Sequence, residues 1–194
     1  NVLAIGDSVI AGVGVDYLRD AFVGQTTQAL AETLGRTVRW SVYGRSGARV
    51  EHLLADYVPL LPEVPADVIL VSVGVNDVTG LTLQPSWRRR LRKLLVTLRE
   101  HSPNAVIGLA GLPPLEEFPL LPEPLRYASG QRGKAFDLVG RRLANGLPGV
   151  VHMPIEFETT DDSFCDDGFH PSAQSYTRFG RCMAELIANE YRKA

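Results

Sequence analysis

Two short groups of polar residues, far apart in this chain, contain the functional groups of an acyl-transfer site. Ser8 offers a hydroxyl, and Asp167 precedes His170 by three residues with a glycine between them. A serine hydroxyl becomes an effective nucleophile when histidine takes its proton near neutral pH. An aspartate that bonds one imidazole nitrogen leaves the other nitrogen free for the serine. Ser8 is therefore the candidate nucleophile, His170 the candidate base and Asp167 its orienting carboxylate, with Asp166 and Asp162 as alternatives to Asp167.

Such a site also needs hydrogen-bond donors that stabilise the negative charge developing on the substrate oxygen. The candidates are the backbone N–H groups of Ser8 and Gly47 and the side-chain amide of Asn76. In comparable sites each preorganised donor contributes roughly 3 kcal/mol. A glycine at position 47 allows the backbone to approach a substrate closely, and Gly44 is an alternative.

The chemistry-bearing groups follow segments that are typical of β-strands, with helical patterns between them. The continuous apolar run at 68–73 indicates a parallel strand that is buried on both faces. This alternation predicts an α/β fold with a mostly parallel five-stranded sheet in the flavodoxin-like order 2-1-3-4-5. The carboxyl ends of parallel strands share one edge, so the groups should converge there. The expected strands are 2–5, 38–43, 68–73, 105–110 and 150–153, and the expected helices are 22–33, 50–57, 87–98, 135–143 and 176–191.

Four blocks of the sequence, in this order, resemble those of the SGNH hydrolase superfamily of GDSL-like lipases and esterases. They are Gly-Asp-Ser-Val at 6–9, Gly47 in a Ser-Gly-Ala run, Gly-Val-Asn-Asp at 74–77, and Asp-Gly-Phe-His-Pro at 167–171. The small-residue context of the second block favours Gly47 over Gly44. The resemblance covers nearly the whole chain. It implies a three-layer α/β/α SGNH hydrolase fold, no metal or other cofactor, and a Ser-His-Asp mechanism on carboxylic esters or thioesters.

Two positions depart from the family pattern, and one further segment bears on the substrate. Val9 replaces the usual leucine, and Val75 replaces a glycine found in some relatives, which should narrow the site near Asn76. The segment 112–125 is rich in proline and large apolar residues, which is unusual for a solvent loop. We expect it to line an acyl pocket, and the alternative is that it caps the core. The candidate substrate-binding residues are Val75, Leu112, Leu115, Phe118 and Phe169, with Leu120 and Leu121 as further candidates in the loop.

Length and charge limit the remaining possibilities. With 194 residues, the chain suits a single hydrolase domain over residues 1–194, and we expect a monomer. A net charge of −2 gives no electrostatic signal for nucleic acid or an anionic membrane. The longest apolar run is too short to span a bilayer, so the sequence predicts a soluble protein. Its compartment stays open between the cytoplasm and, if an upstream signal has been removed, the periplasm or exterior.

The two cysteines, Cys165 and Cys182, form no metal-binding pattern, and we expect free thiols rather than a disulfide. The other histidines, His52, His101 and His152, have no acidic neighbourhood in the sequence comparable to that of His170. We therefore expect them to be structural or exposed.

The sequence thus predicts a serine-dependent hydrolase of carboxylic esters or thioesters, of the esterase, lipase or thioesterase kind. An alternative on the same scaffold is a carbohydrate O-deacetylase, for which Arg45 and Arg49 could favour a polar substrate. Aromatic residues that could stack on a sugar are sparse near the motifs, with Tyr43 and Phe169 as the main exceptions. A non-catalytic binding module is a third alternative, which the presence of all the reactive groups disfavours.

Overall fold

The computed structural model describes residues 1–155 and 162–193, and its centre is a parallel sheet of five strands. The strand order is β2-β1-β3-β4-β5, which confirms the predicted order. At the carboxyl edge Gly6 lies opposite both Gly44 and Ser72, so the ends of the three strands are level there. The strands are β1 Val2–Gly6, β2 Trp40–Gly44, β3 Val68–Ser72, β4 Val106–Ala110 and β5 Val150–Met153.

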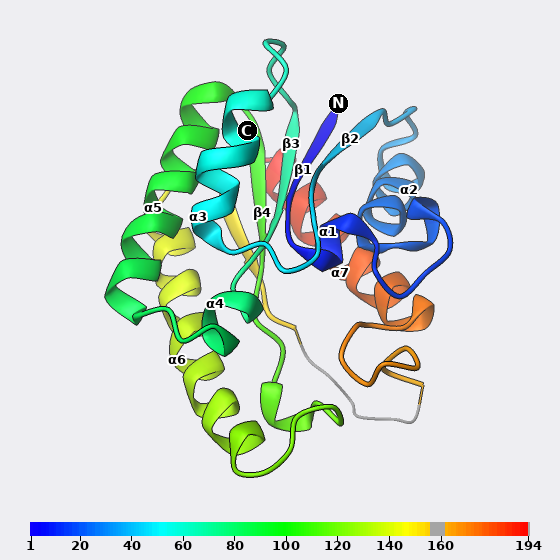
Figure 1. The fold of residues 1–194 in the computed structure, drawn as a ribbon. Coiled ribbons are helices and arrows are strands. Elements are labelled where there is room, and N and C mark those ends of the chain that lie inside the picture. Colours follow the sequence, from blue (N-terminus) through cyan, green and yellow to red (C-terminus); the bar gives the residue numbers. More distant parts are fainter. Residues whose placement is uncertain (156–161, 194) are drawn as a thin grey trace.

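Helices cover both faces of this sheet, as the predicted three-layer arrangement requires. Figure 1 shows α3, α5 and α6 on one face and α2 and α7 on the other. Two short helices, α1 and α4, begin just beyond the ends of β1 and β3. The helices are α1 Ser8–Ala11, α2 Phe22–Leu34, α3 Val50–His52, α4 Val75–Thr79, α5 Gln84–His101, α6 Leu125–Asn145 and α7 Ala173–Tyr191.

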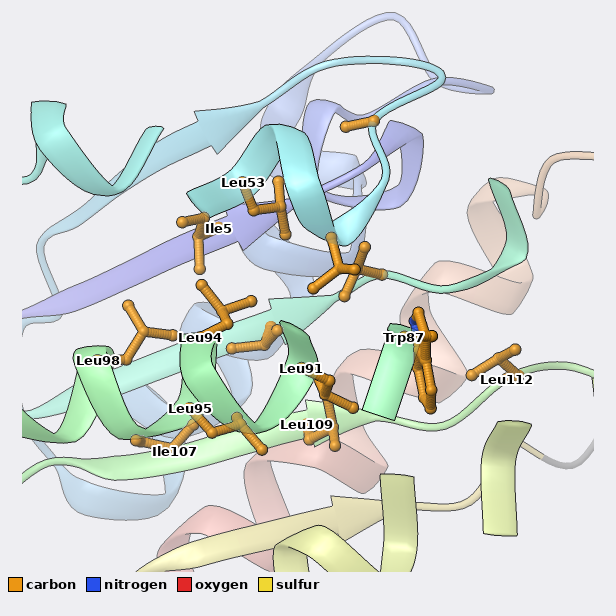
Figure 2. Packing of buried hydrophobic residues seen from close by; sticks show 14 of the residues in the cluster. Ile5, Leu53, Trp87, Leu91, Leu94, Leu95, Leu98, Ile107, Leu109 and Leu112 are labelled. Atoms are coloured by element: carbon orange, nitrogen blue, oxygen red, sulfur yellow. The ribbon is translucent and has the colours of Figure 1, made fainter. Parts of the chain in front are cut away.

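The alternating side chains of the strands divide the core into two clusters, one on each face of the sheet. In β1, Leu3 and Ile5 pack in the cluster with α5 and α6, whereas Val2 and Ala4 pack in the cluster with α2 and α7. Figure 2 shows the first cluster, in which Leu91, Leu94, Leu95 and Leu98 of α5 lie over the sheet. The side chains of α5 that face the sheet are fully buried because their spacing follows one face of the helix.

Two predicted helices differ from those observed. Helix α6 begins at Leu125, well before the expected range of 135–143. The first turns of α6 show no apolar periodicity in the sequence, because a glycine makes the close contact there. A Cβ at Gly130 would lie 2.5 Å from Oε2 of Glu116. The expected helix at 50–57 is only the short α3, which continues as a wider turn over Leu53–Tyr57 and a tighter one over Val58–Leu60.

Within the two described ranges, no helix combines the length and the apolarity needed to cross a lipid bilayer. Cys165 and Cys182 are free thiols, as expected.

Candidate active site

Ser8 lies at the carboxyl edge of the sheet, where β1 ends and α1 begins. Asp7 caps this helix: its Oδ1 accepts hydrogen bonds from the Val9 N–H at 3.2 Å and from Ser72 Oγ at 3.3 Å. The Asp7 N–H donates to the Ser72 carbonyl at 3.0 Å. Burial raises the pKa of the Asp7 carboxyl to about 7, against the opposing effect of the bonds from Val9 and Ser72. The turn that carries Ser8 is therefore fixed to the end of β3.

Asp167 and His170 form a direct pair on the turn before α7. Nδ1 of His170 lies 2.5 Å from Oδ2 of Asp167, and Oδ1 of the same carboxylate accepts from the N–H groups of Phe169 and His170 at 2.8 Å. Burial opposes the charged form, but bonds from His170, Cys165 and Phe169 outweigh it and hold the pKa of Asp167 below its usual range. Because Nδ1 is occupied, Nε2 is the nitrogen of His170 left for proton transfer.

The alternatives to Asp167 make no such contact with the imidazole. Among the described residues, Asp162 accepts a hydrogen bond from Ser172 Oγ through its backbone carbonyl and not through its side chain. No side-chain bond joins Asp166 to His170 in those same ranges. The carboxylate that the structure places on His170 is therefore that of Asp167.

Ser8 and His170 line the same pocket, whose wall is mostly apolar. No hydrogen bond within residues 1–155 and 162–193 joins Ser8 Oγ to His170, an arrangement common where a catalytic pair tightens only with substrate bound. The pocket is lined by Asp7, Ser8, Val9, Phe22, Ser72, Val73, Val75, Ala110, Gly111, Leu112, Pro113, Phe118, Ile155, Phe169, His170, Pro171 and Phe179.

The loop after β4 contributes to this pocket only in part. Leu112 and Phe118 line it, and the Phe118 ring stands edge-on to Phe169 with centroids 5.1 Å apart. Leu115 is fully buried and packs beside Gly133 in the core, so the expected contact of Leu115 with substrate is not supported. Leu120 is exposed, and its N–H donates to the Gly168 carbonyl at 3.1 Å. The loop thus serves both as a pocket wall and as a cap of the core.

Two of the three candidate oxyanion donors, Gly47 and Asn76, lie on segments that are hydrogen-bonded to each other. Nδ2 of Asn76 donates to the Ala48 carbonyl at 3.1 Å, and the Val50 N–H donates to Oδ2 of Asp77 at 3.0 Å. Gly47 precedes Ala48 in an open turn with a φ of 77°, and no atom would contact a Cβ there. Gly44, the alternative, is instead the last residue of β2, packed against Gly6. Gly47 and Asn76 lie outside the set of residues that line the pocket.

Two side-chain contacts were not foreseen from the sequence. Cys165 Sγ donates to Oδ1 of Asp167 at 3.1 Å. The side chain of His152 is buried and has an acidic partner distant in the sequence: its Nε2 lies 3.0 Å from Oδ1 of Asp137, which also accepts the Leu112 N–H at 2.9 Å. The pair joins α6 to β5, and only the relative placement of these two elements brings it together. His52 and His101 bond to backbone and serine groups instead.

The described residues contain no group of three or more histidine, cysteine, aspartate or glutamate side chains placed to hold a metal ion.

Two characterised proteins that resemble this chain in sequence are named esterases. GDSL-like esterase Rv1075c of Mycobacterium tuberculosis is 26% identical over 183 residues, which cover 91% of this chain and 58% of that protein. A multidomain esterase of Ruminococcus flavefaciens is 31% identical over 124 residues, covering 62% of this chain and 15% of that protein. The chain therefore spans less than two thirds of the length of either curated relative.

A solved structure shares the fold over nearly its full length. The family 3 carbohydrate esterase of Clostridium thermocellum matches with a TM-score of 0.76 at 17% identity, over 99% of this chain and 96% of that chain. A family model described as GDSL-like Lipase/Acylhydrolase matches residues 4–178, a range that holds Ser8, Asn76 and His170. The chain belongs to the GDSL-like lipase/acylhydrolase family.

Proposed function

We propose that this chain is a single hydrolase domain over residues 1–194 that cleaves carboxylic esters or thioesters with Ser8 as its nucleophile. The observation that carries the proposal is the pairing of His170 with Asp167 at 2.5 Å in a turn whose histidine lines the same pocket as Ser8. A histidine held at Nδ1 in this way has Nε2 left to act as a general base.

In the proposed reaction Ser8 Oγ attacks the carbonyl carbon while His170 Nε2 takes the hydroxyl proton. The tetrahedral intermediate collapses, and His170 returns the proton to the leaving oxygen or sulfur. Water then attacks the acyl-serine with His170 again acting as base, which releases the acid and restores Ser8. Asp167 keeps Nδ1 of the imidazole occupied and stabilises the imidazolium, and remains ionised throughout because its pKa is low.

The oxyanion of the intermediate would be held by the N–H groups of Ser8 and Gly47 and by the amide of Asn76. An asparagine amide carries two donor hydrogens. One hydrogen of Asn76 is bonded to the Ala48 carbonyl, which fixes the plane of the amide and leaves the second hydrogen for the substrate. A preorganised donor is effective because it does not have to reorient when charge develops.

The lining of the pocket supports an acyl substrate. The side chains of Leu112, Phe118 and Phe169 present apolar surface close to the two residues that would react. Removal of an acyl chain from water against such a wall is favourable by about 25 cal/mol per Å² of apolar area. The two curated relatives are named esterases, in line with this substrate class.

Carbohydrate O-deacetylation is the second candidate, because the Clostridium thermocellum structure with the same fold is a carbohydrate esterase. The same groups would cleave an acetyl ester, and the difference lies in the group that leaves. The apolar wall favours the acyl ester over the sugar.

The test is the hydrolysis of p-nitrophenyl esters from acetate to long acyl chains by the purified chain and by Ser8→Ala. We expect turnover by the wild type that Ser8→Ala abolishes, whereas Ser41→Ala, in the middle of β2, keeps it. The acyl chain length with the highest kcat/KM indicates the length of acyl group that the pocket accepts. A preference for acetylated sugars over all acyl esters would favour the second candidate. Equal turnover by Ser8→Ala would overturn the proposal.

A further inference from the structure

Cys165 closes the turn that carries the candidate base and its carboxylate. Its N–H donates to the His170 carbonyl at 2.9 Å, and its carbonyl accepts from the Gly168 N–H at 3.0 Å. The backbone of Cys165 is therefore bonded to Gly168 and to His170, the residues on either side of Phe169. Any movement of Cys165 would be transmitted to the two functional side chains.

The thiol of Cys165 is bonded to the carboxylate itself. Sγ donates to Oδ1 of Asp167 at 3.1 Å, and the same oxygen accepts the N–H groups of Phe169 and His170. The two amides follow Asp167 in the chain and the thiol precedes it, so the carboxylate is held by groups from both sides of its own position. The Asp167 side chain is 43% exposed, so the thiol holds a carboxylate that solvent also reaches.

The thiol keeps its proton and so remains a donor near neutral pH. Burial raises the pKa of Cys165, and the adjacent charge of Asp167 acts in the same direction. A protonated thiol can donate to a carboxylate, whereas a thiolate would repel it. The sulfur is thus suited to a fixed hydrogen bond rather than to a nucleophilic role.

The sulfur also lies where the turn meets the segment that follows Ser8. A Cβ placed on Gly14 would lie 3.5 Å from Sγ of Cys165 and 2.7 Å from the Pro171 carbonyl. This segment is bonded to the nucleophile, because the Val13 N–H donates to the Ser8 carbonyl at 3.0 Å. Cys165 therefore lies between the turn that carries Asp167 and His170 and the loop at Gly14 that follows α1.

We propose that Cys165 is a positioning residue whose thiol hydrogen bond orients the Asp167 carboxylate and thereby holds the His170 imidazole for proton transfer. It touches no substrate. The proposal rests on the proposed function, since it assigns a task to the same site. Its effect should fall on the chemical step and leave substrate binding unchanged.

The experiment compares Cys165→Ala, which removes the donor, with Cys165→Ser, which replaces the thiol by a hydroxyl donor. We expect Cys165→Ala to lower kcat for p-nitrophenyl butyrate roughly tenfold, the scale of one hydrogen bond to a charged group, with KM within about twofold. Cys165→Ser should keep kcat within about threefold of the wild type. The matched control is Cys182→Ala, because Cys182 is exposed on α7.

The pH profile distinguishes positioning from a purely structural role. With one donor lost, Asp167 directs more of its negative charge at the imidazole, which favours the protonated form of His170. The acid limb of kcat/KM should therefore move to higher pH in Cys165→Ala and stay in place in Cys165→Ser. A Cys165→Ala protein with wild-type kcat and an unmoved acid limb would overturn the inference, as would an equal loss in both variants.

A second measurement covers the case in which Cys165→Ala does not fold. Methyl methanethiosulfonate reacts with the thiol of the folded Cys182→Ala protein, forming a protein S–S–CH3 bond and releasing methanesulfinate. The product has no S–H donor, so we expect activity to fall and dithiothreitol to restore it. Full activity after complete modification would contradict the proposal. If the wild type hydrolyses esters and neither substitution nor modification of Cys165 changes the rate, this inference alone is overturned. If the wild type hydrolyses no ester, the proposed function and this inference fail together.

Discussion

Asn76 and Asp77 are adjacent at the start of α4, and both form hydrogen bonds with the segment that follows Gly47, one as donor and the other as acceptor. The amide of Asn76 donates to the carbonyl of Ala48, and the carboxylate of Asp77 accepts the N–H of Val50. These two bonds, 3.1 and 3.0 Å long, fix the second block of the sequence against the third. The candidate oxyanion donors are thus placed by one another as well as by the strands that precede them.

The first prediction concerns Asn76. Asn76→Ala removes a proposed oxyanion donor and the bond to Ala48, so we expect kcat for ester hydrolysis to fall by about 10²- to 10³-fold. Steady-state kinetics with p-nitrophenyl butyrate measure this change. Asn104→Ala, an exposed asparagine in the turn before β4, should leave kcat unchanged. A loss of less than about threefold in Asn76→Ala would remove Asn76 from the site.

The second prediction separates two neighbouring aspartates. Asp167 contacts His170, and Asp166 makes no such contact in the described ranges. Asp167→Asn should reduce kcat by about 10³-fold or more, because the imidazole loses its charged partner and its fixed tautomer. Asp166→Asn should stay within about twofold of the wild type. The opposite order in the measured kcat values would reassign the carboxylate.

The third prediction concerns pH and Asp7. The folded chain holds a proton on Asp7 up to a pH of about 7, whereas an unfolded aspartate loses it near pH 4. Between these values the folded state binds more protons, so this carboxyl lowers the free energy of unfolding as the pH rises. Asn at position 7 keeps an acceptor for Val9 and Ser72 without the charge.

We therefore expect Asp7→Asn to gain stability relative to the wild type between pH 4 and pH 7, by a total on the order of 4 kcal/mol. Urea unfolding at a series of pH values measures the difference. A constant difference between the two proteins over this range would contradict the raised pKa.

The fourth prediction tests the core that supports the site. Leu94 is fully buried in the cluster between α5 and the sheet, as Figure 2 shows. Leu94→Ala should reduce the free energy of unfolding by about 2–5 kcal/mol, because it removes apolar contacts and leaves a cavity. Arg92→Ala, exposed on the same helix, should change it by less than about 0.5 kcal/mol. Denaturant titration gives both values, and equal losses would place Leu94 outside the core.

The sheet order, and the placement of Ser8 and Asn76 just beyond strand ends, could be predicted because both depend on local patterns. The apolar run at Val68–Ser72 and the polar residues after each strand are visible in the sequence, and a parallel sheet brings strand ends to one edge. The start of α6 could not be predicted, because Gly130 has no side chain and this absence is what allows Glu116 to approach closely. Such a contact leaves no apolar periodicity to detect.

Contacts between side chains on separate elements could not be predicted. The pairing of His152 with Asp137 depends on how α6 lies against β5, and the burial of Leu115 depends on the small surface that Gly133 offers. The bond from Cys165 to Asp167 depends on the conformation of one turn. Residue type and spacing leave each of these undetermined.

The proposed function requires Ser8 to be a nucleophile that His170 activates. The most direct test is to treat the protein with a fluorophosphonate probe and locate the modified residue by peptide mass spectrometry. We predict one phosphonylated residue, Ser8, with labelling lost in Ser8→Ala and strongly slowed in His170→Ala. Labelling of another residue in the wild type, or a rate that His170→Ala leaves unchanged, would contradict the proposed function.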